Sequence, residues 1–182
     1  MVGLVLLDRD GVLNEDSSNY VKSPDELIMI PGAAAAVARI NRASIPVAVC
    51  TNQSAVGRGI IDVAMLERIH AKLRAELARA GAKIDEIFFC PDPPGMNSTC
   101  RKPAPGMLQA ALRRFRVAPP DAPMIGDQLG DLQAAATLGC PRHLVRTGNG
   151  IKTQGNGVPT TVLPVAVHDD LAAAITAILG PP

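Results

Sequence analysis

Two carboxylates one residue apart, Asp8 and Asp10, come directly after the apolar run 2–7. Such a run is typical of a buried strand, and acids at its end contribute nothing to a core. They suit chemistry at a strand end, but Asp10 with Gly11 also fits a plain turn, with Asp8 as a solvated strand terminus. This segment alone leaves both interpretations open.

Polar residues also follow two other strand-like runs and precede one predicted helix. In a parallel sheet, ligands bind beyond the carboxyl ends of the strands where the strand order reverses, so we expect these residues to meet. The start of a helix favours an anion as well. The residues are Thr51, Asn52, Gln53 and Ser54 after 46–50, Asp127 and Asp131 after 123–126, and Arg101 and Lys102 before 105–116.

These residue types fit phosphoryl transfer assisted by a divalent cation. Asp8, Asp10 and Asp127 offer the hard oxygen ligands that suit Mg²⁺. A carboxylate can attack phosphorus and form an aspartyl phosphate, while Lys102 and Thr51 can stabilise charge on the transferring group. A second carboxylate, for which Asp10 is the candidate, can protonate the leaving alkoxide and then take a proton from the attacking water.

Strand-like and helix-like segments alternate along the chain, which predicts an α/β fold with a parallel sheet covered on both faces. Asp62 is expected to cap one helix and Gly81 to close it. Residues 148–160, rich in Gly, Asn, Thr and Pro, predict an exposed loop with turns. The predicted strands are 2–7, 46–50, 84–89, 123–126, 142–146 and 161–163, and the predicted helices are 32–43, 62–80, 105–116, 128–139 and 169–179.

Composition predicts one soluble domain over residues 1–182. The chain has 182 residues and 47% hydrophobic content, enough for one full core. A formal charge of +1, without any basic block longer than Arg113 and Arg114, disfavours a nucleic-acid surface. We expect no targeting leader and no membrane span, and therefore a cytoplasmic monomer.

The cysteine and histidine patterns predict no chemistry of their own. The four cysteines lie far apart without a CxxC motif, which favours reduced thiols. Cys50 and Cys140 are expected to be small buried apolar groups. His70 is expected at the surface or boundary of its helix, and no histidine, including His143 and His168, is assigned to catalysis because none has a partner for a triad.

Four segments, in order, resemble the four motifs of the haloacid dehalogenase (HAD) superfamily of phosphatases. A closer resemblance, to the branch that contains heptose-bisphosphate and histidinol phosphatases, extends to about residue 148. It implies a Rossmann-like three-layer domain, and the chain has no insertion long enough for a separate cap domain. The motif segments are Asp8 to Leu13, Thr51 with Asn52, Lys102 with Pro103, and Gly126 to Asp131.

The resemblance implies a role for each matching residue. Asp8 would be the nucleophile, and Asp10 the acid/base that also lends its backbone carbonyl to Mg²⁺. Asp127 would be the third metal ligand, while Thr51 and Lys102 would hold the transferring phosphoryl group.

Further residues would support the site or bind the substrate. Asp131 would orient Lys102 or its loop, and Arg101 would bind the distal phosphate of the substrate. Gln128 stands where heptose phosphatases often have Lys, which would weaken a contact with the sugar or its phosphate. The sugar would be lined by Asp16, Ser17, Ser18, Asn19, Tyr20, Asn52, Gln53 and Ser54.

The loop before Arg101 departs from the pattern of this branch. Relatives often bind a structural zinc there with a Cys-x-His and a Cys-x-Cys pair, where this chain has Cys90 and Asp92, then Ser98 and Cys100. Structural zinc takes four Cys or His ligands. Two cysteines cannot supply that set, so no zinc is expected.

The expected function is that of a Mg²⁺-dependent phosphomonoesterase. The closer resemblance implies that it removes the 7-phosphate of D-glycero-D-manno-heptose 1,7-bisphosphate, in the ADP-heptose branch that feeds lipopolysaccharide. Histidinol phosphate or another small sugar phosphate is the alternative substrate, but Arg101 beside Lys102 favours a bisphosphate because a second phosphate needs a second cation. A non-catalytic phosphate-binding module would not need both Asp8 and Asp10. A phosphotransferase would need a cap that excludes water.

Overall fold

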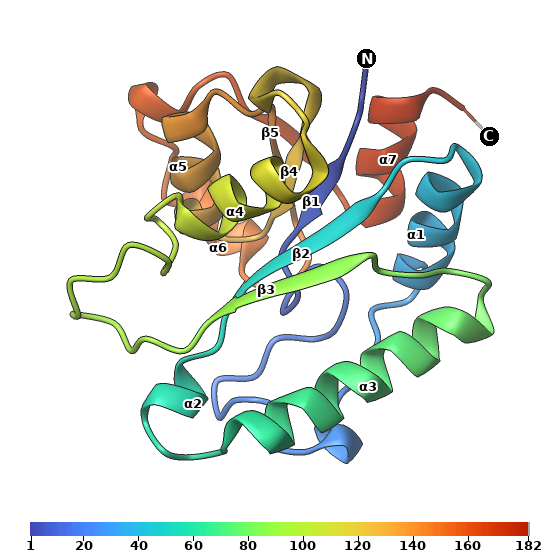
Figure 1. Ribbon diagram of the computed structural model, residues 1–182. Helices are drawn as coiled ribbons and strands as arrows, with labels where there is room; N and C mark the ends of the chain where they lie inside the picture. Colours follow the sequence, from blue (N-terminus) through green and yellow to red (C-terminus); the bar gives the residue numbers. More distant parts are fainter. Residues whose placement is uncertain (182) are drawn as a thin grey trace.

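A six-stranded parallel sheet forms the centre of the computed structural model, which describes residues 1–181 (Figure 1). The strand order is β3-β2-β1-β4-β5-β6, and every strand pair is parallel. The chain runs outward from β1 to β3 and then returns to the other side of β1, so the strand order reverses between β1 and β4. The strands are β1 (Val5–Leu7), β2 (Val47–Asn52), β3 (Glu86–Cys90), β4 (Met124–Gly126), β5 (Arg142–Val145) and β6 (Ala166–His168).

Helices cover both faces of the sheet, which confirms the predicted three-layer α/β architecture. Side chains alternate across a strand, so Val5 and Leu7 pack into one core with α1, α3 and α7, while Leu4 and Leu6 pack into another with α4 and α5. All four residues are fully buried. The helices are α1 (Ala33–Arg42), α2 (Ser54–Gly57), α3 (Val63–Arg79), α4 (Gly106–Phe115), α5 (Leu129–Leu138), α6 (Gly150–Gly155) and α7 (Leu171–Leu179).

The long helix α3 begins and ends where the sequence predicts. The Asp62 carboxylate accepts a hydrogen bond from the backbone N–H of Met65 at 2.7 Å, which satisfies one of the free donors of the first turn. Gly81, just beyond the helix, has a φ of +68°, which suits the reversal at its C-terminus. No helix within residues 1–181 combines the length and the apolar character needed to cross a bilayer.

The C-terminal part differs from its prediction in two places. Residues Gly150–Gly155 form helix α6 where an exposed loop was expected, and a Cβ at Gly150 would overlap the carbonyl oxygen of Val145, so only glycine fits there. Residues Thr160–Val162 form a 3₁₀ helix, and the last strand lies later, at Ala166–His168. Proline has no N–H to donate to a neighbouring strand, so strand pairing begins only beyond Pro164.

The prediction of reduced thiols is wrong for one cysteine pair. Cys90 and Cys100 form a disulfide with Cα atoms 5.7 Å apart, a separation that permits this bond. Cys50 and Cys140 are free and fully buried, as predicted. The Asp92 carboxylate lies 3.6 Å from the sulfur of Cys100, and the expectation that this loop binds no zinc stays a prediction.

The placement of His70 at a surface or boundary is also wrong, because this residue is 3% exposed. It shares the buried face of α3 with Leu66 and Leu73, at the spacing that brings helical residues onto one side. Burial, together with the positive charges of Arg9 and Arg74, lowers the pKa of His70 to about 4. The ring is therefore neutral at neutral pH.

Candidate active site

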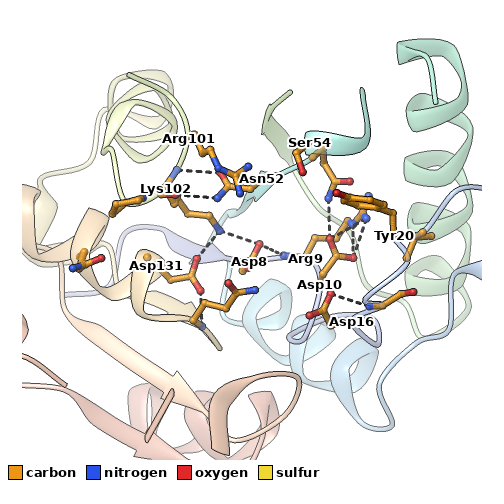
Figure 2. A pocket seen from close by; sticks show the side chains of 17 residues that line it. Asp8, Arg9, Asp10, Asp16, Tyr20, Asn52, Ser54, Arg101, Lys102 and Asp131 are labelled. Carbon is orange, nitrogen blue, oxygen red and sulfur yellow. Dashed lines mark hydrogen bonds and ion pairs between the residues drawn. The ribbon is translucent and has the colours of Figure 1, made fainter. Parts of the chain in front are cut away.

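The carboxyl ends of β1 and β2 and the start of α5 open onto one pocket of about 370 Å³ (Figure 2). The pocket lies where the strand order reverses, as expected for ligand sites of parallel sheets. Most residues expected at the site line it, together with Arg9, which was not predicted. Those expected are Asp8, Asp10, Asp16, Ser17, Tyr20, Asn52, Gln53, Ser54, Arg101, Lys102, Gln128 and Asp131.

Four predicted residues are absent from this lining. Thr51 and Asp127 are fully buried at the ends of their strands. Ser18 borders a neighbouring hollow that also includes Asp16 and Asn149. The exposed Asn19 lines neither, and its carbonyl accepts a hydrogen bond from a lysine side chain.

Lys102 is the central cation of the site. Its Nζ atom lies 3.0 Å from Asp8 Oδ1 and 2.6 Å from Asp131 Oδ1, and donates to the carbonyl of Cys50 at 2.7 Å (Figure 2). Burial alone would lower the pKa of Lys102, but the two carboxylates outweigh it and raise that pKa. The ammonium is therefore charged, and the structure places Asp131 against it as expected.

Asn52 fixes the main chain of Lys102. Its side-chain amide donates to the carbonyl oxygen of Lys102 at 3.1 Å, and its Oδ1 accepts from the backbone N–H of Lys102 at 3.0 Å. Two hydrogen bonds between the same groups resist rotation of the loop. The end of β2 thus holds the lysine next to the end of β1.

A cradle of donors holds the carboxylate of Asp10. Arg9 binds both of its oxygens, while Asn14 donates to Oδ1 and Gln53 to Oδ2, each at 2.8 Å. The same Gln53 amide lies 2.8 Å from Thr51 Oγ1 and so joins β2 to the cradle. Burial opposes ionisation of Asp10, but the charge of Arg9 and these hydrogen bonds outweigh it and lower the pKa of Asp10.

Asp8, Asp127 and Asp131 form a cluster of buried acids. Each offers an oxygen, and these oxygens lie within 4.8 Å of one another. Burial first, and then the neighbouring carboxylates, raise the pKa of Asp8 to about 7 and that of Asp127 to about 8. Asn149 donates its backbone N–H to Asp127 Oδ2 at 2.7 Å, whereas the buried Oδ1 has no partner among the described residues. An unpartnered buried oxygen beside a second carboxylate fits a hard divalent cation such as Mg²⁺.

Two glycines allow the chain to approach this cluster closely. A Cβ at Gly11 would lie 2.3 Å from Asp127 Oδ2, and one at Gly148 would lie 2.4 Å from the same oxygen. Both residues have positive φ, a backbone conformation that favours glycine. Gly148 was expected only as a turn residue, and the structure shows that it packs against the acid cluster.

Arg101 places a second cation on the rim of the pocket. It is half-buried, and its Nη1 atom donates to the carbonyl of Asp92 at 2.9 Å. Burial and the positive charge of Arg58 lower the pKa of Arg101. An anion bound at Arg101 would offset the positive charge that Arg58 imposes there.

Sequence reasoning missed three residues that shape the site, namely Arg9, Asn14 and Asn149. Arg9 could have been noticed, because an arginine between two acids at the end of a buried strand needs a buried partner. Asn14 directly follows the first motif segment but received no role. Asn149 lies 22 residues from Asp127 in the chain, and nothing in the sequence indicates their contact.

The comparison with family models defines the class of protein. Residues 99–174, which include Lys102, Asp127 and Asp131, match the HAD-hydrolase-like family model. The parallel sheet and the acids at its topological switch point agree with that match. The chain is a HAD-like hydrolase.

Relatives narrow the class further. A Bordetella bronchiseptica protein called D-glycero-beta-D-manno-heptose-1,7-bisphosphate 7-phosphatase is 47% identical over 97% of both chains, and a Pseudomonas aeruginosa protein of the same name is 44% identical over 97% of both. The crystal structure of D,D-heptose 1,7-bisphosphate phosphatase from B. bronchiseptica, complexed with magnesium and phosphate, is 46% identical over 98% of both chains, with a TM-score of 0.92. The chain belongs to the family of heptose-1,7-bisphosphate 7-phosphatases.

Proposed function

We propose that this protein is a Mg²⁺-dependent phosphomonoesterase that removes the 7-phosphate of D-glycero-D-manno-heptose 1,7-bisphosphate. The observation that carries the proposal is the ion pair of Lys102 with Asp8 beside the unpartnered oxygen of Asp127. A nucleophile, a fixed cation and free metal-binding capacity lie together there. The names of the relatives support the choice of substrate.

In the first half of the reaction, Asp8 attacks phosphorus. An Oδ–P bond forms as the bond between phosphorus and the sugar oxygen breaks, and the leaving oxygen takes a proton from Asp10. The charge of the bound phosphate raises the pKa of Asp10, because like charges disfavour ionisation, and so favours the protonated acid. Lys102 and Thr51 stabilise the charge on the transferring oxygens.

In the second half, water hydrolyses the aspartyl phosphate. Asp10, now ionised, takes a proton from water while the water oxygen bonds to phosphorus and the bond to Asp8 breaks. Inorganic phosphate leaves, and both carboxylates return to their starting states. The lowered pKa of Asp10 in its cradle keeps it in the ionised form that this step requires.

Asp8, Asp127 and the backbone carbonyl of Asp10 would hold Mg²⁺. The bound ion supplies positive charge that offsets the phosphate and the clustered carboxylates. The buried Asp127 Oδ1, which has no protein partner among residues 1–181, supports this assignment.

Removal of Mg²⁺ is expected to abolish phosphate release. Chelation should lower kcat by at least about 10³-fold, because oxygen ligands that suit a metal then repel each other and the phosphate instead. The measurement is steady-state phosphate release with EDTA and after restoration of Mg²⁺. Asp127→Asn should raise the Mg²⁺ concentration required for half-maximal rate. Full activity in EDTA would contradict the metal assignment.

Arg101 is proposed to bind the distal 1-phosphate, with Asp16, Ser17, Tyr20, Ser54 and Gln128 around the sugar. Its place in the pocket lining, together with the positive charge of Arg58 that acts on it, supports this role. Arg101→Ala should raise KM for the bisphosphate by about tenfold or more, the cost of one charged hydrogen bond, and leave KM for a monophosphate nearly unchanged. Steady-state kinetics with both substrates measures this split. An equal rise in KM for the two substrates would show that Arg101 does not bind the distal phosphate.

The substrate is tested by comparing kcat/KM for heptose 1,7-bisphosphate and histidinol phosphate. The proposal predicts a clear preference for the bisphosphate, and a preference for histidinol phosphate would overturn it. We also propose that the chain acts as one domain, because a single sheet joins every strand of the described residues.

A further inference from the structure

Arg9 lies between the two acids of the proposed mechanism and has no role in it so far. Its side chain is 1% exposed, although a guanidinium keeps its charge under all ordinary conditions. A buried charge needs a partner, and here the partner is Asp10, which is 20% exposed and lines the pocket. Arg9 thus holds the Asp10 carboxylate within the pocket that both residues line (Figure 2).

The contact between Arg9 and Asp10 is bidentate. Arg9 Nη2 donates to Oδ1 at 2.9 Å and to Oδ2 at 3.0 Å, and Nε donates to Oδ1 at 3.2 Å. A planar guanidinium that binds both oxygens fixes the plane of the carboxylate, because rotation of that group breaks the contacts together. A lysine ammonium is a point charge and cannot fix that plane.

The main chain of Arg9 also contacts the nucleophile. Its backbone N–H donates to Asp8 Oδ1 at 2.7 Å. One residue therefore binds the attacking acid through its backbone and the proton-transferring acid through its side chain. In-line transfer requires the two acids to meet the phosphoryl group on its attacked and leaving sides, so their relative placement decides the rate.

The geometry points to Arg9 as the positioning residue of the general acid/base, Asp10. This inference rests on the proposed function, in which Asp10 transfers the proton in both half-reactions. Arg9 touches neither the substrate nor the reacting atoms in this role. It holds the Asp10 carboxylate where the leaving oxygen, and later the attacking water, must be.

The test separates the two half-reactions with p-nitrophenyl phosphate. Its nitrophenolate leaves without a proton, so transfer of the phosphoryl group to Asp8 does not need Asp10, whereas hydrolysis of the aspartyl phosphate does. In Arg9→Met we expect a burst of about one nitrophenolate per enzyme, followed by a steady state slowed by about 10²-fold or more. KM should fall with kcat, and kcat/KM should change little, because hydrolysis of the aspartyl phosphate then limits the rate. Arg9→Lys should show an intermediate loss of steady-state rate, since lysine keeps the positive charge but cannot bind both oxygens of Asp10 with a planar group.

One control variant, a sugar substrate and a folding measurement complete the experiment. Arg113→Met, at an exposed position of α4, should behave as the unmodified protein. With heptose 1,7-bisphosphate, Arg9→Met should show no phosphorylation burst, because the alkoxide needs the proton from Asp10. Circular dichroism reports whether each variant is folded.

The outcomes distinguish this inference from the proposed function. A purely structural Arg9 would lower burst and steady state together, in proportion to the folded fraction, and that result overturns the inference. So does an unchanged steady state, or failure of both Arg9 variants to fold. If the unmodified protein turns over neither p-nitrophenyl phosphate nor heptose 1,7-bisphosphate, the proposed function is wrong. If the unmodified protein is active and the Arg9 variants are equally active, only the role of Arg9 is wrong.

Discussion

Asp8→Asn is expected to lower kcat for phosphate release by at least about 10⁴-fold, the scale on which loss of a covalent nucleophile acts. An amide of the same shape cannot attack phosphorus. The fold should survive, because burial already disfavours the charged form of Asp8, whose pKa rises to about 7, and Lys102 keeps its contact with Asp131. Steady-state phosphate release and a thermal melt measure the two effects.

The matched control for this prediction is Asp25→Asn. Asp25 is exposed on the 3₁₀ helix Pro24–Glu26, so the same chemical change there should leave kcat within about twofold, as for most surface substitutions. Turnover of Asp8→Asn within about tenfold of the unmodified protein would remove Asp8 as the nucleophile.

Lys102→Met is expected to reduce both activity and stability. Its loss leaves the buried carboxylates of Asp8 and Asp131 without their shared cation, which should cost about 3–5 kcal/mol in the free energy of unfolding. The transferring phosphoryl group also loses its fixed positive charge, so kcat should fall by about 10²–10³-fold. Denaturant unfolding and steady-state kinetics measure the two losses.

Lys83→Met provides the matched control for Lys102. Lys83 also forms an ion pair, with Asp85 at 2.9 Å, but its side chain is 71% exposed. A solvent-exposed pair contributes about 0–1 kcal/mol, so this variant should lose little stability and no activity. Equal destabilisation of the two variants would contradict the account of Lys102 as a buried counter-ion.

Local patterns in the sequence predicted the elements that position the site. The apolar run before Asp8 and the polar residues after the second and fourth strands were sufficient to place the site at the carboxyl edge of a parallel sheet. The Asp62 cap of α3 was also readable, because capping depends on neighbours in the sequence. Each of these patterns depends on residues that are close together in the sequence.

Features that depend on distant contacts could not be predicted. The disulfide of Cys90 and Cys100 depends on how a loop returns to the end of β3, which residue spacing does not show. The contact of Asn149 with Asp127 depends on the same kind of packing. The burial of His70 does not, because its helical spacing with Leu66 and Leu73 already placed it on the buried face of α3. Helix propensity is a weak guide where tertiary contacts determine the secondary structure. For that reason α6 forms in a segment rich in turn residues.

The environments of Asp8 and Asp10 agree with a division of labour between them. Asp8 lies against Lys102 in a cluster of acids, whereas Asp10 lies in a cradle of Arg9, Asn14 and Gln53. Burial raises the pKa of the first, and the cradle lowers the pKa of the second. The opposite shifts show that the two carboxylates stand in different electrostatic environments.

The assignment of Asp8 as the nucleophile and Asp10 as the acid/base is tested most directly by trapping the covalent intermediate. The protein is quenched with acid during turnover of p-nitrophenyl phosphate and reduced with borohydride, which converts an aspartyl phosphate into homoserine. Its peptides are then analysed by mass spectrometry. The account predicts homoserine at position 8 in the unmodified protein and a larger yield in Arg9→Met, in which hydrolysis of the intermediate is slowed. Homoserine at position 10, or at neither position, would contradict it.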